Sequence, residues 1–257
     1  QNYRVNQMAD FRPLIKAADG STCRIFVAIQ SMMSEALDVE TIEMCRATAC
    51  NYWAQGIDGL FLDRGWFADW PYGASFYEKL RELPYPHLMA QKDKRYHVLT
   101  GLGRIAGLEL PAKLPATLEP GIPTAVDFTI SDDLARWDGI GRVHDVLLRV
   151  GIEGISELDR ISFKLNGKEL PTRDMRTINL MFRMSVPRNR SEGGYWFIFR
   201  PDRDHWPNQE KNTLVVTLLE RDSDLTQKVS LQHVELETKY LMGKNFYRED
   251  VDPDLGV

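Results

Sequence analysis

The segment from Asp63 to Tyr72 concentrates side chains that can bind a polar ligand. Its sequence, Asp63-Arg-Gly-Trp-Phe-Ala-Asp-Trp-Pro-Tyr72, holds two tryptophans, a phenylalanine, a tyrosine, two aspartates and an arginine. A sugar suits such a set, because the C–H faces of a pyranose stack on aromatic rings while its hydroxyl groups bond to charged groups. The candidate ligand-binding residues are therefore Asp63, Arg64, Trp66, Asp69 and Trp70.

Asp63 and Asp69 are also the candidates for acid–base chemistry in this segment. Hydrolysis of a glycosidic bond normally uses two carboxyl groups about 5–10 Å apart, one on each side of the bond. The spacing of these two residues does not by itself make them such a pair. A structural interpretation also stays open, in which Trp66 and Trp70 fill an internal interface and Asp63 pairs with Arg64.

The elements that must position this segment are short apolar strands alternating with helices. Residues 24–29 and 59–62 are apolar runs typical of strands covered on both faces, and amphipathic helical patterns precede, separate and follow them. Helix–strand alternation up to about Leu83 predicts parallel sheet units with right-handed crossovers. In parallel sheets ligands bind at the carboxyl ends of the strands, which adds Gln30, directly after the first run, to the candidates.

The rest of the chain has the pattern of an all-β domain. Prolines interrupt the helical pattern from Pro84 onward, and alternating apolar runs separated by turn residues follow. Asn166-Gly167 predicts a two-residue hairpin, and a phase change near Gln232-His233 predicts a β-bulge. Together these features predict a β-sandwich of jelly-roll type, with strands at 125–130, 143–152, 160–165, 195–199, 213–219 and 229–240.

Composition and charge narrow the function classes. The apolar fraction of 43% and charged fraction of 27% are those of a folded protein, and the net charge of −5 disfavours a nucleic-acid partner. Without an apolar run of about 18 residues, we expect no membrane-spanning helix. No motif predicts a cofactor or a metal, and Cys23, Cys45 and Cys50 are expected to be buried free thiols. Asp202, Asp204, His205 and Trp206 have the residue types of a metal or sugar site, but we favour a polar turn with an anchoring tryptophan.

The first eighty residues are too few to form a complete parallel sheet. Two strands cannot bury their own faces, so we expect more strands from a missing N-terminal part or from another subunit. The chain begins at Gln1 rather than at a methionine, so we expect it to be processed or to be a piece of a longer protein.

Several segments resemble one known family. The run Cys50-Asn-Tyr-Trp-Ala-Gln-Gly-Ile-Asp-Gly-Leu-Phe-Leu62, the helix end Lys79-Leu-Arg-Glu-Leu83 and the hairpin Leu165-Asn-Gly-Lys-Glu-Leu170 resemble the last barrel unit and trailing sandwich of secreted bacterial glycoside-hydrolase-like TIM barrels. Later strands, at 211–216 and 234–237, are similar too.

The resemblance implies an α/β plus all-β fold. Residues 1–100 would be the C-terminal portion of a (β/α) barrel, and residues 101–257 a β-sandwich accessory domain. It also implies an extracellular or periplasmic protein that acts on or binds an oligo- or polysaccharide at the strand ends. Asp63 is the catalytic candidate that the residue types of the aromatic segment, residues 63–72, supply. Gln30 stands about where many such enzymes carry the nucleophilic glutamate, which puts catalysis in doubt.

Three functions therefore stay open. The leading hypothesis is a glycoside-hydrolase-like, carbohydrate-active protein. The alternatives are a non-catalytic glycan-binding or pseudoenzyme module, and a structural or assembly protein whose aromatic segment is a subunit interface.

Overall fold

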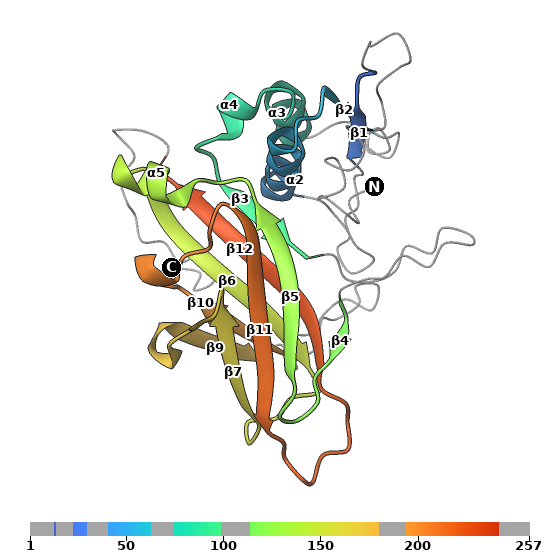
Figure 1. The fold of residues 1–257 in the computed structure, drawn as a ribbon, viewed down its shortest axis with the longest axis vertical. Coiled ribbons are helices and arrows are strands. Elements are labelled where there is room, and N and C mark those ends of the chain that lie inside the picture. The colour runs from blue at the N-terminus through green and yellow to red at the C-terminus, as the bar shows by residue number, and fades with distance from the viewer. Residues whose placement is uncertain are drawn as a thin grey trace, which may run out of the picture.

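A computed structural model of the chain describes residue 13 and residues 23–29, 41–62, 74–98, 114–179 and 194–241. Within these residues the fold has two parts (Figure 1): a small α/β layer and a larger β-sandwich. The α/β layer contains strands β1 (Phe26–Ile29) and β2 (Gly59–Leu62), which pair in parallel with Phe26 opposite Gly59. The predicted neighbouring parallel strands are thus confirmed.

Helix α2 (Ile42–Ala54) connects the two strands and is buried on all sides. It begins at Thr41, whose side chain accepts a hydrogen bond from the backbone N–H of Met44 at 3.4 Å. Every residue from Met44 to Tyr52 is buried, because α2 lies between the β1–β2 pair and the sandwich. Helices α3 (Ala74–Glu82) and α4 (Pro86–Met89) complete this layer.

The sandwich consists of two sheets whose described strand pairings are all antiparallel. The larger sheet has the strand order β3-β12-β6-β10-β9, with the short β4 beside β12. Its strands are β3 (Lys94–His97), β4 (Ala116–Thr117), β6 (Val143–Glu153), β9 (Met175–Asn179), β10 (Tyr195–Phe199) and β12 (Ser230–Tyr240). The smaller sheet has the order β5-β11-β7-β8, formed by β5 (Pro123–Ile130), β7 (Arg160–Leu165), β8 (Lys168–Glu169) and β11 (Glu210–Glu220).

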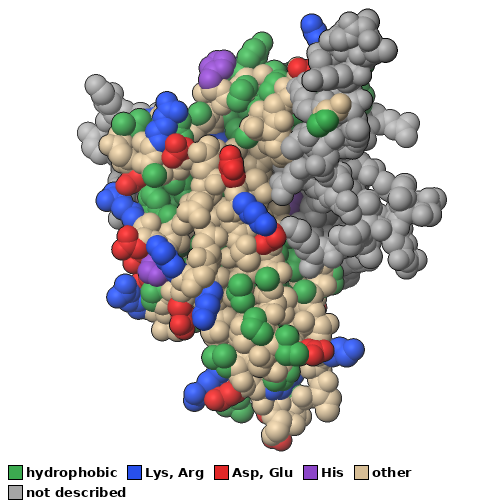
Figure 2. All heavy atoms as spheres, viewed as in Figure 1, with side chains coloured by type: hydrophobic (Ala, Val, Ile, Leu, Met, Phe, Trp, Pro, Cys, Tyr) green, Lys and Arg blue, Asp and Glu red, His purple; other side chains and the backbone are tan. Residues whose placement is uncertain are grey.

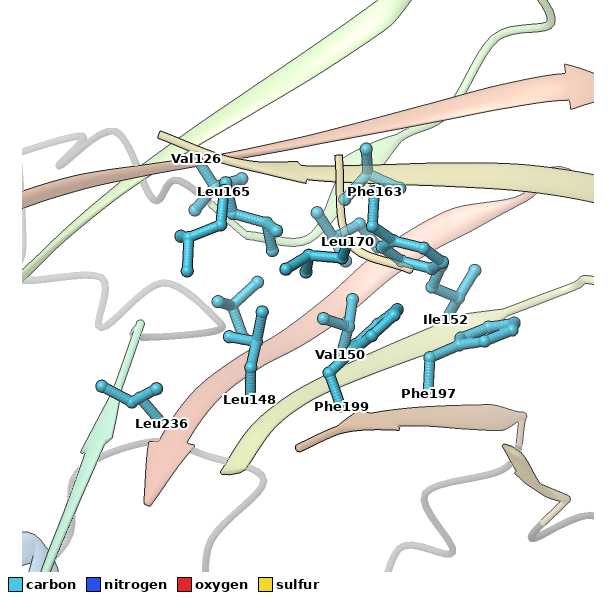
Figure 3. Close-up of a cluster of buried hydrophobic side chains, with 14 of the residues drawn as sticks. Val126, Leu148, Val150, Ile152, Phe163, Leu165, Leu170, Phe197, Phe199 and Leu236 are labelled. Atoms are coloured by element: carbon cyan, nitrogen blue, oxygen red, sulfur yellow. The ribbon is translucent and has the colours of Figure 1, made fainter. Parts of the chain in front are cut away.

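The main hydrophobic core fills the space between these sheets. Figure 3 shows Leu148, Val150 and Ile152 of β6 pointing toward side chains of the opposite sheet such as Phe163 and Leu165. Phe163 contacts Phe197 and Phe199 with ring centroids 5.1 and 5.0 Å apart. Alternate residues of each strand thus form the core, as the period-two pattern of the sequence predicts.

A buried polar network lies where α2 packs on the sandwich, and one of its bonds joins the two. The Lys94 ammonium, which is fully buried, lies 2.9 Å from Asp132 Oδ1, and the Thr238 hydroxyl donates to Asp132 Oδ2 at 2.8 Å. The Asn51 side chain of α2 donates to the backbone carbonyl of Thr129 in β5 at 2.9 Å. These bonds pair polar groups that would otherwise be costly to bury.

The local predictions for the sandwich are confirmed. Asn166 and Gly167 form the β7–β8 turn with positive φ of 52° and 83°, as a type I′ hairpin requires. The pairing of β12 with β6 shifts register between Leu231 and His233, where the bulge was expected. Short elements complete the described chain: α5 (Leu134–Gly139), η4 (Thr172–Asp174) and η5 (Arg203–His205).

The partial TIM barrel predicted for residues 1–100 is wrong. A barrel requires successive parallel strands in one sheet, whereas the described parallel pairing is limited to β1 with β2, and β3 joins an antiparallel sheet of the sandwich. The β-rich remainder agrees with the predicted sandwich. The domain boundary near residue 100 stays a prediction. Within the described residues, no helix combines the length and apolar character needed to cross a bilayer.

Candidate functional site

The six residues predicted as a sugar site lie outside the described residues, namely Gln30, Asp63, Arg64, Trp66, Asp69 and Trp70. The strand ends that precede them are described: Ile29 ends β1, Leu62 ends β2, and the two are paired in register. The expectation that residues 30 and 63 follow neighbouring strand ends is therefore met. Whether their side chains form a site stays a prediction.

Of the three cysteines, two behave as predicted. Cys45 and Cys50 are buried free thiols, whereas Cys23 is exposed, so the prediction of burial is wrong there. Burial raises the pKa of Cys50 to about 12. Because the nucleophilic form of cysteine is the thiolate, Cys50 is not suited to nucleophilic catalysis.

The turn after β10 is a structural turn, in agreement with the sequence interpretation. The ring Nδ1 of His205 lies 2.6 Å from Asp202 Oδ1, and this hydrogen bond lowers the pKa of the Asp202 carboxyl. Trp206 packs against the core and donates from Nε1 to the carbonyl of Pro201 at 3.0 Å. Among the described residues, no group of three or more His, Cys, Asp or Glu side chains is placed to hold a metal.

The strongest candidate among the described residues is the outer face of the six-stranded sheet. Pairing brings outward-facing side chains of neighbouring strands into rows: His97 of β3 lies opposite Glu235 of β12, which lies opposite Arg149 of β6. In the next row Arg95 of β3 lies opposite Glu237 of β12. Residues two apart in a strand share a face, so these five side chains lie together on one side of the sheet, where Glu235 is buried and the other four are half-buried.

Ion pairs link four of these side chains, Arg95, Arg149, Glu235 and Glu237, which we call the charged face. Arg95 donates to Glu235 Oε2 from both Nε and Nη2, at 2.9 and 2.5 Å. Arg149 Nε lies 3.0 Å from Glu237 Oε1 without the alignment of a hydrogen bond. Arg95 Nε also lies 3.8 Å from Glu237 Oε1, so each charge is balanced by a neighbour.

Two aromatic rings lie beside the charged face. Trp196 of β10 and His233 of β12 stack with centroids 5.2 Å apart and an interplanar angle of 13°. Both lie opposite Gly151 of β6, the strand between them. A Cβ at Gly151 would lie 3.1 Å from His233 Cδ2 and 3.3 Å from Trp196 Cζ2. The absence of a side chain at this position therefore lets the rings lie across the middle strand.

His97 lies beside the charged face as an uncharged group. Burial is the main cause that lowers its pKa to about 4, against the opposing effect of the Glu235 carboxylate. The ring is therefore neutral near pH 7. Its Nε2 atom is buried and has no hydrogen-bond partner.

The sequence contained a signal for this surface. The alternation His233-x-Glu235-x-Glu237-x-Lys239 places four polar residues on the outward face of a strand that was correctly predicted. Their partners on β3 and β10 were not found, because pairing of strands far apart in the chain cannot be read from local pattern.

No protein-family model matches the chain, and a search of curated proteins found no match.

Proposed function

We propose that this protein binds carbohydrate through the outer face of the six-stranded sheet. The observation that carries the proposal is the Trp196–His233 ring pair beside the charged face. An indole ring offers a flat apolar surface for the C–H face of a pyranose. The half-buried Arg95, Arg149 and Glu237 next to it offer polar groups to the hydroxyl groups that the sugar directs to its sides.

The sequence supports the same class of ligand. The segment Asp63–Tyr72 has the residue types of a sugar site, and the resemblance to secreted glycoside-hydrolase-like proteins extends the proposal to an extracellular or periplasmic protein. We propose binding rather than hydrolysis for the sheet face. Glu235 and Glu237 both engage arginines, whereas hydrolysis needs one carboxyl group that carries a proton.

The test measures affinity for a panel of neutral and acidic oligosaccharides by calorimetry with the full chain. Trp196→Ala is expected to weaken binding at least about tenfold, because it removes the stacking surface, while Trp196→Phe retains part of the affinity. Tyr85→Ala, which removes an exposed aromatic ring from the α3–α4 connection, is the matched control and should change nothing.

Two outcomes count against the proposal, and they differ. Failure of the wild-type chain to bind any sugar of the panel contradicts the function. Binding that survives Trp196→Ala and is lost in Trp66→Ala with Trp70→Ala contradicts the sheet face and places the sugar at the aromatic segment.

An assembly function is the second candidate, favoured by the outer side of the β1–β2 pair. Phe26 and Phe61 are each 59% exposed, on the face of this pair opposite the one that packs against α2. Parallel sheets are normally covered on both faces. Light scattering over a range of concentrations tests this candidate: self-association abolished by Phe26→Ser with Phe61→Ser supports it, and a monomer at every concentration contradicts it.

A further inference from the structure

Three connections between strands lie together at one end of the sandwich. Residues 118–122 lead from β4 to β5, residues 154–159 join β6 to β7, and residues 221–229 join β11 to β12. The register places them at the same end, because Thr117 of β4 and Glu153 of β6 both pair with Ser230 of β12 (Figure 1). We call these connections, together with Leu219 and Glu220 at the end of β11 and Arg160 at the start of β7, the sandwich tip.

Hydrogen bonds to one buried carboxylate hold the sandwich tip together. Asp159 accepts from the backbone N–H groups of Ser156 at 2.8 Å and Asp222 at 2.6 Å, and it pairs with Arg221. Burial raises the pKa of Asp159, but these donors outweigh burial and lower it overall. Gly154 packs so closely on the next connection that an added Cβ would lie 2.2 Å from the carbonyl oxygen of Lys228. The connections are thus fixed relative to one another.

This frame presents four large apolar side chains to solvent. Their exposed fractions are 52% for Ile122, 73% for Leu158, 53% for Leu219 and 42% for Leu225. Leu219 lies where the pairing of β11 with β7 shifts register, and Ile122 lies beside it because Gly121 donates to the carbonyl of Leu218 at 2.7 Å. Figure 2 shows hydrophobic side chains gathered at this end, over the ends of β5 and β11.

The charges around these side chains are mainly acidic. Two basic residues are engaged within the tip, Arg221 by Asp159 and Arg160 by Glu220 at 3.3 Å. The other charged side chains of the sandwich tip are those of Glu119, Glu157, Asp222, Asp224 and Lys228. The surface therefore combines exposed leucine and isoleucine with an excess of carboxylates, on a frame that does not need to reorder on binding.

We propose that the sandwich tip is a docking surface for a basic, apolar segment of another protein. The exposed apolar side chains supply buried area on binding, and the carboxylates select lysine or arginine on the partner. The same charge disfavours the other occupants: a second copy would bring acidic tip against acidic tip, and an anionic membrane would repel it. This inference is independent of the proposed sugar binding, which lies on the sheet face.

The experiment titrates the full chain with a synthetic amphipathic peptide of leucine and lysine, using calorimetry. A peptide with glutamate in place of lysine controls for charge. We expect the lysine peptide to bind and Leu158→Ser with Leu219→Ser to weaken it at least about tenfold. Added salt should weaken binding as well, because the contacts between the tip carboxylates and the peptide lysines are electrostatic. Ile140→Ser is the matched control, because the Ile140 side chain is 63% exposed and lies outside the tip.

Any of three results overturns the proposal. Affinity that is unchanged in the double variant shows that the peptide binds elsewhere. Equal affinity for the glutamate peptide removes the role of the carboxylates. Binding of the wild type to phosphatidylserine vesicles that is lost in the double variant assigns the tip to a membrane. Self-association in sedimentation that the double variant abolishes assigns the tip to a second copy. Near-ultraviolet circular dichroism confirms that the variants, changed at exposed positions, remain folded.

Discussion

His97 shows how the folded structure changes the chemistry of a single side chain. The sheet buries its imidazole ring against β12, where the pKa falls to about 4. In the unfolded chain a histidine has its ordinary pKa of about 6.5. The charged form is therefore disfavoured only in the folded state.

This difference predicts a pH-dependent stability. Between pH 4 and 6.5 the unfolded state binds more protons at His97 than the folded state, so the free energy of unfolding rises with pH in that window. Above that window the contribution of His97 no longer changes with pH. From pH 7 to pH 5 the wild type should lose about 2 kcal/mol more than His97→Gln, measured by urea unfolding. His87→Gln, at an exposed position, should keep the wild-type pH dependence; if His97→Gln also keeps it, His97 is not the cause.

At the scale of elements, the sandwich depends on a few close approaches between connections. Gly154 has a positive φ of 74°, and its α-carbon lies against the backbone at Lys228. A glycine is required there for two reasons: other residues rarely adopt this φ, and a side chain has no room.

Gly154→Ala is therefore expected to lower the free energy of unfolding by about 2–4 kcal/mol. Gly139→Ala is the matched control, because nothing lies within 4 Å of an added Cβ there and its φ is ordinary. Its effect should stay within about 1 kcal/mol. Urea unfolding followed by circular dichroism measures both, and equal effects of the two substitutions would contradict the packing argument.

For the whole molecule, the central question is how the α/β layer and the sandwich are joined. Asn51 of α2 donates to β5, and beside Cys50 of α2 the sandwich residues Lys94 and Asp132 form a buried ion pair. Thr238, also in the sandwich, shares the Asp132 carboxylate. Removing one member of a buried ion pair leaves an uncompensated charge, whereas removing both does not.

Lys94→Met is expected to lower the free energy of unfolding by about 3–5 kcal/mol, and adding Asp132→Leu should restore most of that loss. Arg160→Met, in a pair exposed on both sides, is the control and should cost less than about 1 kcal/mol. Far-ultraviolet circular dichroism and tryptophan fluorescence should give coincident unfolding curves in the wild type, because the packing of α2 on the sandwich makes the two parts one cooperative unit. Separate transitions would show that the two parts unfold independently.

The sequence by itself determined the features that short stretches of chain control. Alternating apolar residues set strands such as β7 and β10, Asn166-Gly167 set a hairpin, and the phase change near His233 set a bulge. Each is a local property, because side-chain period and turn conformation act over a few residues.

Only the tertiary structure decided which strands are neighbours and hence what the surface can bind. The sequence does not predict β3, because Lys94-Arg-Tyr-His97 has a polar pattern. Its lysine and arginine fit a sheet only through their distant partners Asp132 and Glu235. The same long-range pairing forms antiparallel sheets where a barrel was predicted. It also places Trp196 against His233 across Gly151. Such contacts join distant parts of the chain, and their energies become favourable only when the sheets have formed.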